Sequence, residues 1–213
     1  MMKIYDCLQG TDEWQLHRLG KITASKFSIL MGKSFAKTVY TYAYEIVAEM
    51  LTGEWKEVSA IQMDWGHENE PKARKNYKLA TFNHVEEVGF IEYNNMIGCS
   101  PDGLVGQTGM LEIKCPWNSS NHVISLVKKN VPEIYKAQVQ GQLWIAGREW
   151  CDFVSFDPRV KDLSKQLIII RANRDEGYIK ELQDKVFRFV DVICGLLGNL
   201  GLNNLLEQEQ QQV

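Results

Sequence analysis

The feature that most constrains the fold of this 213-residue chain is a hairpin pattern between residues 99 and 116. It reads Cys-Ser-Pro-Asp-Gly-Leu, then a polar, glycine-containing turn at residues 105–109, then Met-Leu-Glu-Ile-Lys-Cys-Pro. Two short runs joined by such a turn predict an antiparallel hairpin. Because side chains alternate between the faces of a strand, Glu112 and Lys114 share one face, and the apolar residues between them face the core.

The polar face of this hairpin carries the residue types of a divalent-cation site. Asp102 stands at the open end of the first strand, where the flanking proline and glycine free it from regular pairing. Glu112 and Lys114 are roughly 6–7 Å apart along the second strand. Two carboxylates and a backbone carbonyl suit Mg²⁺ or Mn²⁺, with a second ion about 4 Å away, and Lys114 could orient or deprotonate a water. The alternative is an exposed hairpin in which Glu112 and Lys114 are solvated neighbours.

The hairpin motif S-P-D-G-L…L-E-I-K-C-P resembles the core of the bacteriophage lambda exonuclease family, the YqaJ-like viral recombinases of the PD-(D/E)xK nuclease superfamily. The resemblance extends from about residue 9 to residue 178 through further motifs in order: G-T-D-E-W, R-L-G-K-I-T-A-S, W-G-x-x-x-E, A-Q-V-Q and F-D-P-R. It implies an α/β, restriction-endonuclease-like core with a central mixed β-sheet of about five strands flanked by α-helices.

The resemblance implies roles for the charged residues of the hairpin and for one glutamate before it. Asp102 and Glu112 would hold the metal ions together with the carbonyl of Ile113, and Glu70 would assist as a further metal ligand and catalytic residue. Lys114 would position the attacking water. Pro71, directly after Glu70, departs from the family pattern and is expected either to start a new helical segment or to kink the helix around it.

A glutamine is the remaining catalytic candidate. The resemblance places Gln140 near Lys114 and the attacking water, on a helix that begins at Pro132. Gln138 lies two positions earlier and therefore points in a different direction. Gln138 and Tyr135 are candidates for lining the same cleft, and the alternative for Gln140 is a buried glutamine with no chemical role.

The first thirty residues contain a candidate anion site. Residues 26–31 are expected to form a helix capped by residues 23–25, and a helix N-terminus offers unpaired N–H groups to an anion. Arg18 adds a bidentate phosphate donor. The resemblance implies that Arg18, Ser25 and Ser100 bind the 5′-terminal phosphate of a substrate; without it, Arg18 would be an ordinary surface arginine.

The family implies a metal-dependent 5′→3′ exodeoxyribonuclease that resects double-stranded DNA ends to mononucleotides and leaves 3′ single-stranded overhangs. It also implies Mg²⁺ or Mn²⁺ with two ions per site, a homotrimer, and a single-strand annealing protein as partner. Two alternatives use the same scaffold, a structure-specific endonuclease and a non-catalytic DNA-end-binding subunit. The intact D…E-x-K pattern argues against the subunit, and a 5′-phosphate pocket argues against the endonuclease because it blocks internal entry.

Composition limits the class of protein but does not itself suggest DNA. A chain that is 45% hydrophobic can bury one substantial core, so residues 1–197 are expected to form a single domain, followed by a polar, Gln-rich, disordered tail at residues 198–213. No apolar run approaches the ~18 residues that span a bilayer. Five cysteines without a Cys-x-x-Cys pair indicate reduced thiols and the cytoplasm of a bacterial host cell. The net charge of −3 does not favour a nucleic-acid partner, but the motifs do.

Hydrophobic periodicity predicts the remaining elements. Four basic residues follow Pro71, and they form either a solvated face or a contact with the DNA backbone: Lys72, Arg74, Lys75 and Lys78. Helices are expected over residues 38–51, 60–80 and 175–197, and strands over residues 83–93, 150–156 and 167–170.

Overall fold

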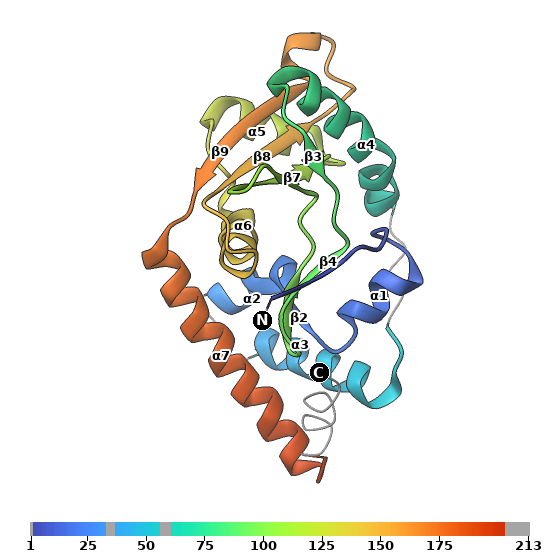
Figure 1. Cartoon of the computed structure of the whole chain (residues 1–213), viewed down its shortest axis with the longest axis vertical. Helices are drawn as coiled ribbons and strands as arrows, with labels where there is room; N and C mark the ends of the chain where they lie inside the picture. Colours follow the sequence, from blue (N-terminus) through green and yellow to red (C-terminus); the bar gives the residue numbers. More distant parts are fainter. Residues whose placement is uncertain (1, 33–36, 56–60, 203–213) are drawn as a thin grey trace.

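The computed structural model describes residues 2–32, 37–55 and 61–202, and its architecture is α/β with two mixed sheets and helices around them (Figure 1). The larger sheet has the strand order β3-β6-β7-β8-β9. These strands are β3 (Val85–Glu86), β6 (Gly103–Val105), β7 (Gly109–Lys114), β8 (Trp150–Phe156) and β9 (Leu167–Asn173). This five-stranded mixed sheet confirms the predicted fold class.

The smaller sheet has the order β1-β4-β5-β2, built from β1 (Lys3–Tyr5), β4 (Phe90–Asn94), β5 (Ile97–Cys99) and β2 (Ile22–Thr23). This second sheet is not among the elements predicted from the sequence. The single strand expected over residues 83–93 is in fact two strands, β3 and β4, one in each sheet. The physical reason is long-range pairing: Phe90 lies opposite Tyr5 of β1, a contact that a local pattern does not contain.

The hairpin forms as predicted. β6 and β7 pair antiparallel, with Leu104 opposite Met110 and Val105 opposite Gly109. The turn contains Gly106 at φ 57°, a left-handed conformation that favours glycine. β8 then pairs parallel to β7, with Phe153 opposite Glu112.

Helices cover both faces of β7 (Figure 1). α4 (Ile61–Thr81) covers one face, where Leu111 and Ile113 pack with Ala73 and Tyr77. α6 (Glu133–Ile145) contributes to the main core on the other face, which includes Met110. The alternative of an exposed hairpin is therefore wrong, because both faces of the strand are buried.

Helix α4 runs through Pro71 without ending, so the expectation that a new helical segment starts there is wrong. Proline in a helix interior removes one backbone hydrogen bond. Here the residue is exposed on the solvent side, and the opposite side of α4 stays packed against β7 through Ala73 and Tyr77. The packed side therefore holds the helix together across the proline.

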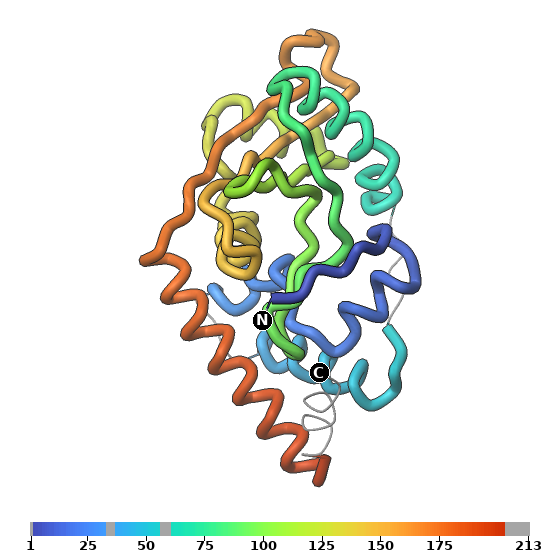
Figure 2. The backbone as a smooth tube through the Cα atoms, in the orientation of Figure 1, coloured from blue at the N-terminus to red at the C-terminus, as the bar shows by residue number. Residues whose placement is uncertain are grey.

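The remaining helices enclose the main core. They are α1 (Asp12–Arg18), the 3₁₀ turn η1 (Ala24–Lys26), α2 (Phe27–Met31), α3 (Lys37–Thr52), α5 (Ser119–Lys128), the 3₁₀ turn η2 (Leu163–Lys165) and α7 (Glu176–Asn199). The trace in Figure 2 shows α7 as a long closing helix on the outside, where it contacts α2, α3 and α6.

No helix in the described part of the chain is both long and apolar enough to cross a membrane. Most of the expected tail, residues 203–213, lies outside the described residues.

Candidate active site

Asp102 is held against the end of β7 by backbone hydrogen bonds. Its own N–H donates to the carbonyl of Leu111 at 3.1 Å. Its Oδ2 atom accepts from the N–H of Ile113 at 2.5 Å. The proline before it and the glycine after it let the chain turn here, and the result is a carboxylate beside the peptide that joins Glu112 to Ile113.

Glu112 is buried, with 1% of its surface exposed, and it is surrounded by hydrogen-bond donors. Its Oε1 atom lies 2.5 Å from Nζ of Lys114 and accepts from Nε2 of Gln138 at 2.6 Å. Its Oε2 atom accepts from Nε2 of Gln142 at 2.8 Å. A carboxylate that is buried this deeply requires such compensation, because desolvating a charge is costly.

Gln140 does not lie at this site, and the expectation that it neighbours Lys114 is wrong. Its Nε2 donates to the carbonyl of Asn173, and its Oε1 accepts from the N–H of Asp175, both at 2.9 Å. Gln140 thereby ties α6 to the connection between β9 and α7. Gln138 and Gln142 take the place expected for it, because residues four apart share one face of a helix and residues two apart do not. The i, i+4 spacing was the signal for Gln142, which the sequence analysis missed.

Glu70 is joined to the hairpin by Arg74, four residues later on α4. Nη2 of Arg74 lies 2.6 Å from Oε1 of Glu70 and also donates to the backbone carbonyl of Asp102 at 3.1 Å. Nη1 donates to Glu87 at 2.7 Å. Arg74 therefore belongs to neither expected class, solvated face or DNA backbone contact: it connects the glutamate on the helix to the aspartate on the hairpin.

These charges act on one another. Burial raises the pKa of Asp102 well above its usual value, and the negative charges of Glu112 and Glu70 raise it further. Burial disfavours the charged form of Lys114, but the negative charges of Glu112 and Asp102 outweigh burial and raise the pKa of the lysine. The site is therefore a cluster of carboxylates with too little positive charge beside it, which is the situation that a bound cation relieves.

The donor set fits a hard divalent cation, although the carboxylates do not converge in advance. No three His, Cys, Asp or Glu side chains in the described residues lie close enough together to hold a metal ion. Glu112 faces its three donors and Glu70 faces Arg74 instead. Oxygen ligands from Asp102, Glu112 and Glu70 are nonetheless the chemistry that Mg²⁺ or Mn²⁺ prefers. Two atoms beside them, Nε of Arg74 and Oε1 of Gln142, are buried without a hydrogen-bond partner in the described structure.

Arg18 and Ser100, two of the expected phosphate ligands, lie in contact. Nη1 of Arg18 donates to Oγ of Ser100 at 3.4 Å, and its guanidinium stacks on the ring of Trp14 at 4.1 Å. The indole N–H of Trp14 also donates to Oγ of Ser100, at 2.9 Å. No carboxylate within the described ranges forms an ion pair with Arg18, and burial lowers the pKa of its guanidinium. The carboxylate of Glu49 acts on Arg18 from beyond ion-pair distance. A partly buried arginine that forms no ion pair is suited to binding an anion.

Ser25 is placed differently. It is exposed, and its Oγ lies 3.1 Å from the hydroxyl of Thr23 rather than on Arg18. It lies within the 3₁₀ turn η1, and the helix expected at residues 26–31 follows it as α2. The parallel pairing of Thr23 with Gly98 nonetheless sends the chains that lead to Ser25 and Ser100 in the same direction.

A cleft of about 710 Å³ extends from the acidic cluster to Trp14, the aromatic partner of Arg18. Glu70, Arg74 and Asp102 line it on one side, and Gln9 and Trp14 on the other. Gln9 also donates to the carbonyls of Val88 and Pro101, both at 2.9 Å, and so fixes the chain directly before Asp102. Two of the candidate metal ligands, Glu70 and Asp102, therefore share a cleft with Trp14, the residue on which Arg18 stacks.

The comparisons with known proteins agree with this geometry. Residues 13–149 match the YqaJ-like viral recombinase domain, a span that contains the hairpin, α4 and the whole of α6. The chain belongs to the YqaJ-like viral recombinase family. No curated protein sequence matches it.

Solved structures extend the likeness of this YqaJ-like protein beyond that domain. The alkaline exonuclease LHK-Exo from Laribacter hongkongensis is 37% identical, with a TM-score of 0.83 over 90% of this chain and 96% of that one. Its complex with dAMP gives 38% identity and the same TM-score over 89% and 96%. A phage-related exonuclease from Haemophilus somnus 129PT shares the fold at 16% identity, with a TM-score of 0.70 over 84% and 96% of the two chains.

Proposed function

We propose that this YqaJ-like protein is a metal-dependent 5′→3′ exodeoxyribonuclease that resects double-stranded DNA ends to mononucleotides and leaves 3′ single-stranded overhangs. The observation that carries the proposal is the hairpin itself, where Asp102 binds the Ile113 N–H directly beside the Glu112–Lys114 ion pair and Arg74 links Glu70 to the Asp102 carbonyl. The likeness to an alkaline exonuclease, which has been solved in complex with dAMP, supports a nuclease that releases nucleoside monophosphates.

Asp102, Glu112, Glu70 and the carbonyl of Ile113 would hold Mg²⁺ or Mn²⁺, with two ions per site. When bound, such a cation polarises a phosphoryl oxygen and lowers the pKa of a water molecule. Without the metal, Arg74 keeps Glu70 beside the backbone of Asp102 by binding both residues. Gln142 donates to Oε2 of Glu112 and so restrains the orientation of that carboxylate.

Lys114 acts in this proposal as a cation. Its pKa is raised by the carboxylates despite burial, so the ammonium is retained at neutral pH and donates hydrogen bonds rather than accepting a proton. Placed beside a scissile phosphate, it would orient the attacking water and offset the negative charge that develops on phosphorus. Gln138, bound to the same oxygen of Glu112, would take the water-positioning role first expected of Gln140.

The direction of digestion would come from the arginine side of the cleft. Arg18 and Ser100 would bind the 5′-terminal phosphate, with Ser25 joining them from η1. A pocket that grips a terminal phosphate requires a free end and excludes internal positions. It therefore favours an exonuclease over a structure-specific endonuclease.

We further propose that the protein works as a homotrimer around DNA, together with a single-strand annealing protein, in the cytoplasm of a bacterial host cell. All five cysteines are free, which accords with a reducing compartment. Light scattering coupled to size-exclusion chromatography tests the trimer directly. A monomer at working concentration would contradict that part of the proposal and leave the chemistry untouched.

Digestion of labelled DNA tests the proposed function. Linear duplexes with a 5′-phosphate, linear duplexes with a 5′-hydroxyl and closed circles are incubated with the protein in Mg²⁺ or in EDTA. In Mg²⁺, we expect 5′-labelled mononucleotides to be released from phosphorylated linear DNA, while the strand that ends 3′ at the same site stays intact. Closed circles should remain uncut, and no DNA should be digested in EDTA. Nicked circles would instead identify an endonuclease, and binding to ends without any digestion would identify a non-catalytic subunit.

A further inference from the structure

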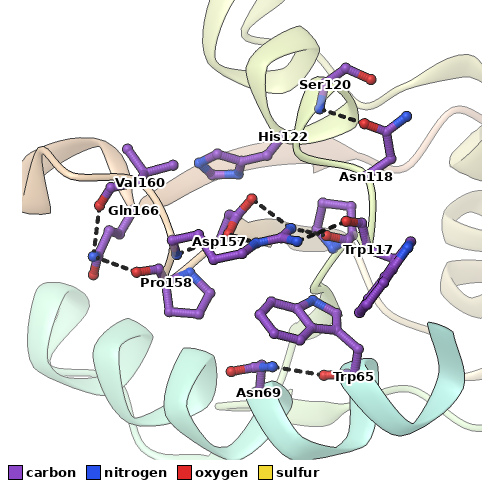
Figure 3. Close-up of polar contacts among 12 residues, drawn as sticks. Trp65, Asn69, Trp117, Asn118, Ser120, His122, Asp157, Pro158, Val160 and Gln166 are labelled. Atoms are coloured by element: carbon purple, nitrogen blue, oxygen red, sulfur yellow. Dashed lines mark hydrogen bonds and ion pairs between the residues drawn. The ribbon is translucent and has the colours of Figure 1, made fainter. Parts of the chain in front are cut away.

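The Phe-Asp-Pro-Arg motif at the end of β8 forms a brace for the chain that leaves the active-site strand (Figure 3). Asp157 is fully buried and accepts from Nε and Nη2 of Arg159 at 2.8 and 2.9 Å. The same guanidinium donates to the backbone carbonyls of Pro116 and Trp117, both at 3.0 Å. One bidentate ion pair thus fixes two consecutive peptides directly after β7.

A second support comes from helix α4. The guanidinium of Arg159 lies over the ring of Trp65 at 4.3 Å. The ring of Trp65 meets that of Trp117 edge to face, with centroids 5.8 Å apart and planes at 81°. Figure 3 shows Trp65 rising from the helix toward Trp117 and Asp157. Trp117 is therefore held through its backbone by Arg159 and through its ring by Trp65.

Despite these restraints, Trp117 as a residue is 47% exposed. It follows Lys114 by three residues, so a fully extended chain places it at most about 11 Å from the lysine backbone. The exposed ring accordingly lies at the border of the acidic cluster.

A rigid, half-exposed aromatic ring beside a phosphodiester-cleaving site is suited to one kind of contact. Every nucleobase presents a flat π-face, and stacking on an aromatic side chain binds it without regard to sequence. A ring that is already immobilised loses little conformational entropy on stacking. A ring that served only to cover Trp65 would need no brace on its own backbone.

We propose that Trp117 is a stacking platform for a base of the DNA substrate, within about three nucleotides of the scissile phosphate, and that the Asp157–Arg159 ion pair is the positioning element that presents it. The inference rests on the proposed nuclease function and adds a substrate contact to it. It also gives the Phe-Asp-Pro-Arg motif a role.

Binding of DNA ends without cleavage tests the inference. The probes are 5′-phosphorylated duplexes with 2-aminopurine at one of the first four nucleotides of either strand, titrated with the full-length protein in Ca²⁺. The variants are Trp117→Ala, Trp117→Phe and Arg159→Ala. Phe82→Ala is the matched control, because Phe82 is an aromatic residue 92% exposed just beyond the opposite end of α4.

We expect Trp117→Ala to weaken binding of the DNA end by about 10- to 100-fold, the range of one base–aromatic stack. Trp117→Phe keeps a ring and should stay within about threefold of the wild type. Arg159→Ala should fall between them because the ring loses its brace. In the wild type, 2-aminopurine should be quenched at one position, and that quenching should disappear in Trp117→Ala and persist in Phe82→Ala.

Equal dissociation constants for Trp117→Ala and wild type, or 2-aminopurine fluorescence that does not change at any position, would overturn the inference. If Trp117→Ala does not fold, Trp117→Phe and the wild-type 2-aminopurine profile decide the question alone. Failure of the proposed function is separate, since a wild-type protein that does not digest linear DNA in Mg²⁺ refutes the nuclease and not merely the stacking contact.

Discussion

Nζ of Lys114 lies 2.5 Å from Oε1 of Glu112, its neighbour two positions back on the same face of β7. The two side chains differ sharply in exposure, 26% for the lysine and 1% for the glutamate. The lysine therefore reaches inward from the open end of the strand to compensate a buried carboxylate. This contact is much closer than the two-residue strand repeat alone implies, because the long lysine side chain bends back over the strand.

Replacing the lysine tests its role as a cation in the chemical step. Lys114→Ala should lower the rate of DNA digestion by about 100- to 1,000-fold, as expected when one electrostatic stabiliser is removed, while the affinity for DNA ends stays within a few-fold of wild type. Lys128→Ala, an exposed lysine on α5, is the control and should digest normally. A Lys114→Ala variant with wild-type rates would remove the lysine from the mechanism.

Substitutions at the three glutamines of α6 should have different effects, on catalysis for Gln138 and Gln142 and on stability for Gln140. Gln138→Ala and Gln142→Ala each remove a donor to Glu112, and we expect digestion to slow by about 10- to 100-fold, as for loss of a group that orients a metal ligand. Gln140→Ala should keep its activity but unfold at a lower temperature, because its side chain joins α6 to the start of α7. Thermal melting temperatures and steady-state digestion rates of the three variants test these expectations. An inactive but stable Gln140→Ala would restore the role first expected of it.

The contrast between the hairpin and the glutamines shows what a sequence can predict here. Asp102, Glu112 and Lys114 lie within one hairpin, so alternation along a strand and one recognisable turn are enough to bring them together. The face that α6 turns toward Glu112 depends on how the helix packs across β7, and no local pattern contains that information. Arg74 was missed for the same reason: it contacts the Asp102 carbonyl 28 positions away.

Arg74 offers a test of the link between α4 and the hairpin. We expect Arg74→Ala to weaken the binding of Mn²⁺ by about 10- to 100-fold, because Glu70 loses the partner that orients it. Isothermal titration calorimetry with the metal alone measures this without any turnover. Glu87→Gln, which removes only the outer partner of Arg74, should bind Mn²⁺ nearly as the wild type does. Tighter binding by Arg74→Ala would mean that the arginine competes with the metal for Glu70.

Asp157 gives a pH-dependent prediction away from the metal ligands. Burial alone would raise the pKa of this carboxyl, but hydrogen bonds from Arg159 and Ser119 outweigh burial and lower it from 3.8 to about 2. A depressed pKa stabilises the folded state above pH 3.8, and this contribution is lost as the pH falls toward 2. Asp157→Asn should therefore cost roughly 2 kcal/mol at neutral pH.

Urea unfolding of wild type and Asp157→Asn between pH 7 and pH 3 measures this difference. It should be constant down to about pH 4 and shrink below that value, since the wild type alone then loses a favourable ionisation. Asp184→Asn, an exposed aspartate on α7, should show no such difference. A gap between wild type and Asp157→Asn that is independent of pH would mean that the carboxylate charge contributes nothing to folding.

Arg18 tests the origin of end recognition. Arg18→Ala should reduce the ratio of digestion rates for 5′-phosphate over 5′-hydroxyl ends by about tenfold or more, the value of a charge-assisted hydrogen bond. Absolute rates on 5′-hydroxyl ends should change little. Arg188→Ala, an exposed arginine on α7, is the matched control. An unchanged ratio in Arg18→Ala would place the phosphate pocket elsewhere.

The contact made by Ser25, near Arg18 in the sequence, could not be predicted from the local pattern. Arg18 and Ser100 could be assigned together and do touch. The expected helix forms as α2, but Ser25 lies in the 3₁₀ turn before it and its hydroxyl contacts that of Thr23 instead. A capping pattern predicts where a helix starts. It does not predict which residue the capping hydroxyl will contact, because that depends on the pairing of β2 with β5.

Anomalous diffraction from a crystal grown with Mn²⁺ tests the central claim most directly, because it locates the metal without reference to any substrate. We predict an anomalous peak in bonding contact with carboxylate oxygens of both Asp102 and Glu112, and loss of that peak in Asp102→Asn. Density that leaves the Asp102 and Glu112 side chains on their present partners, with no Mn²⁺ between them at millimolar metal, would contradict a metal-dependent nuclease at this hairpin.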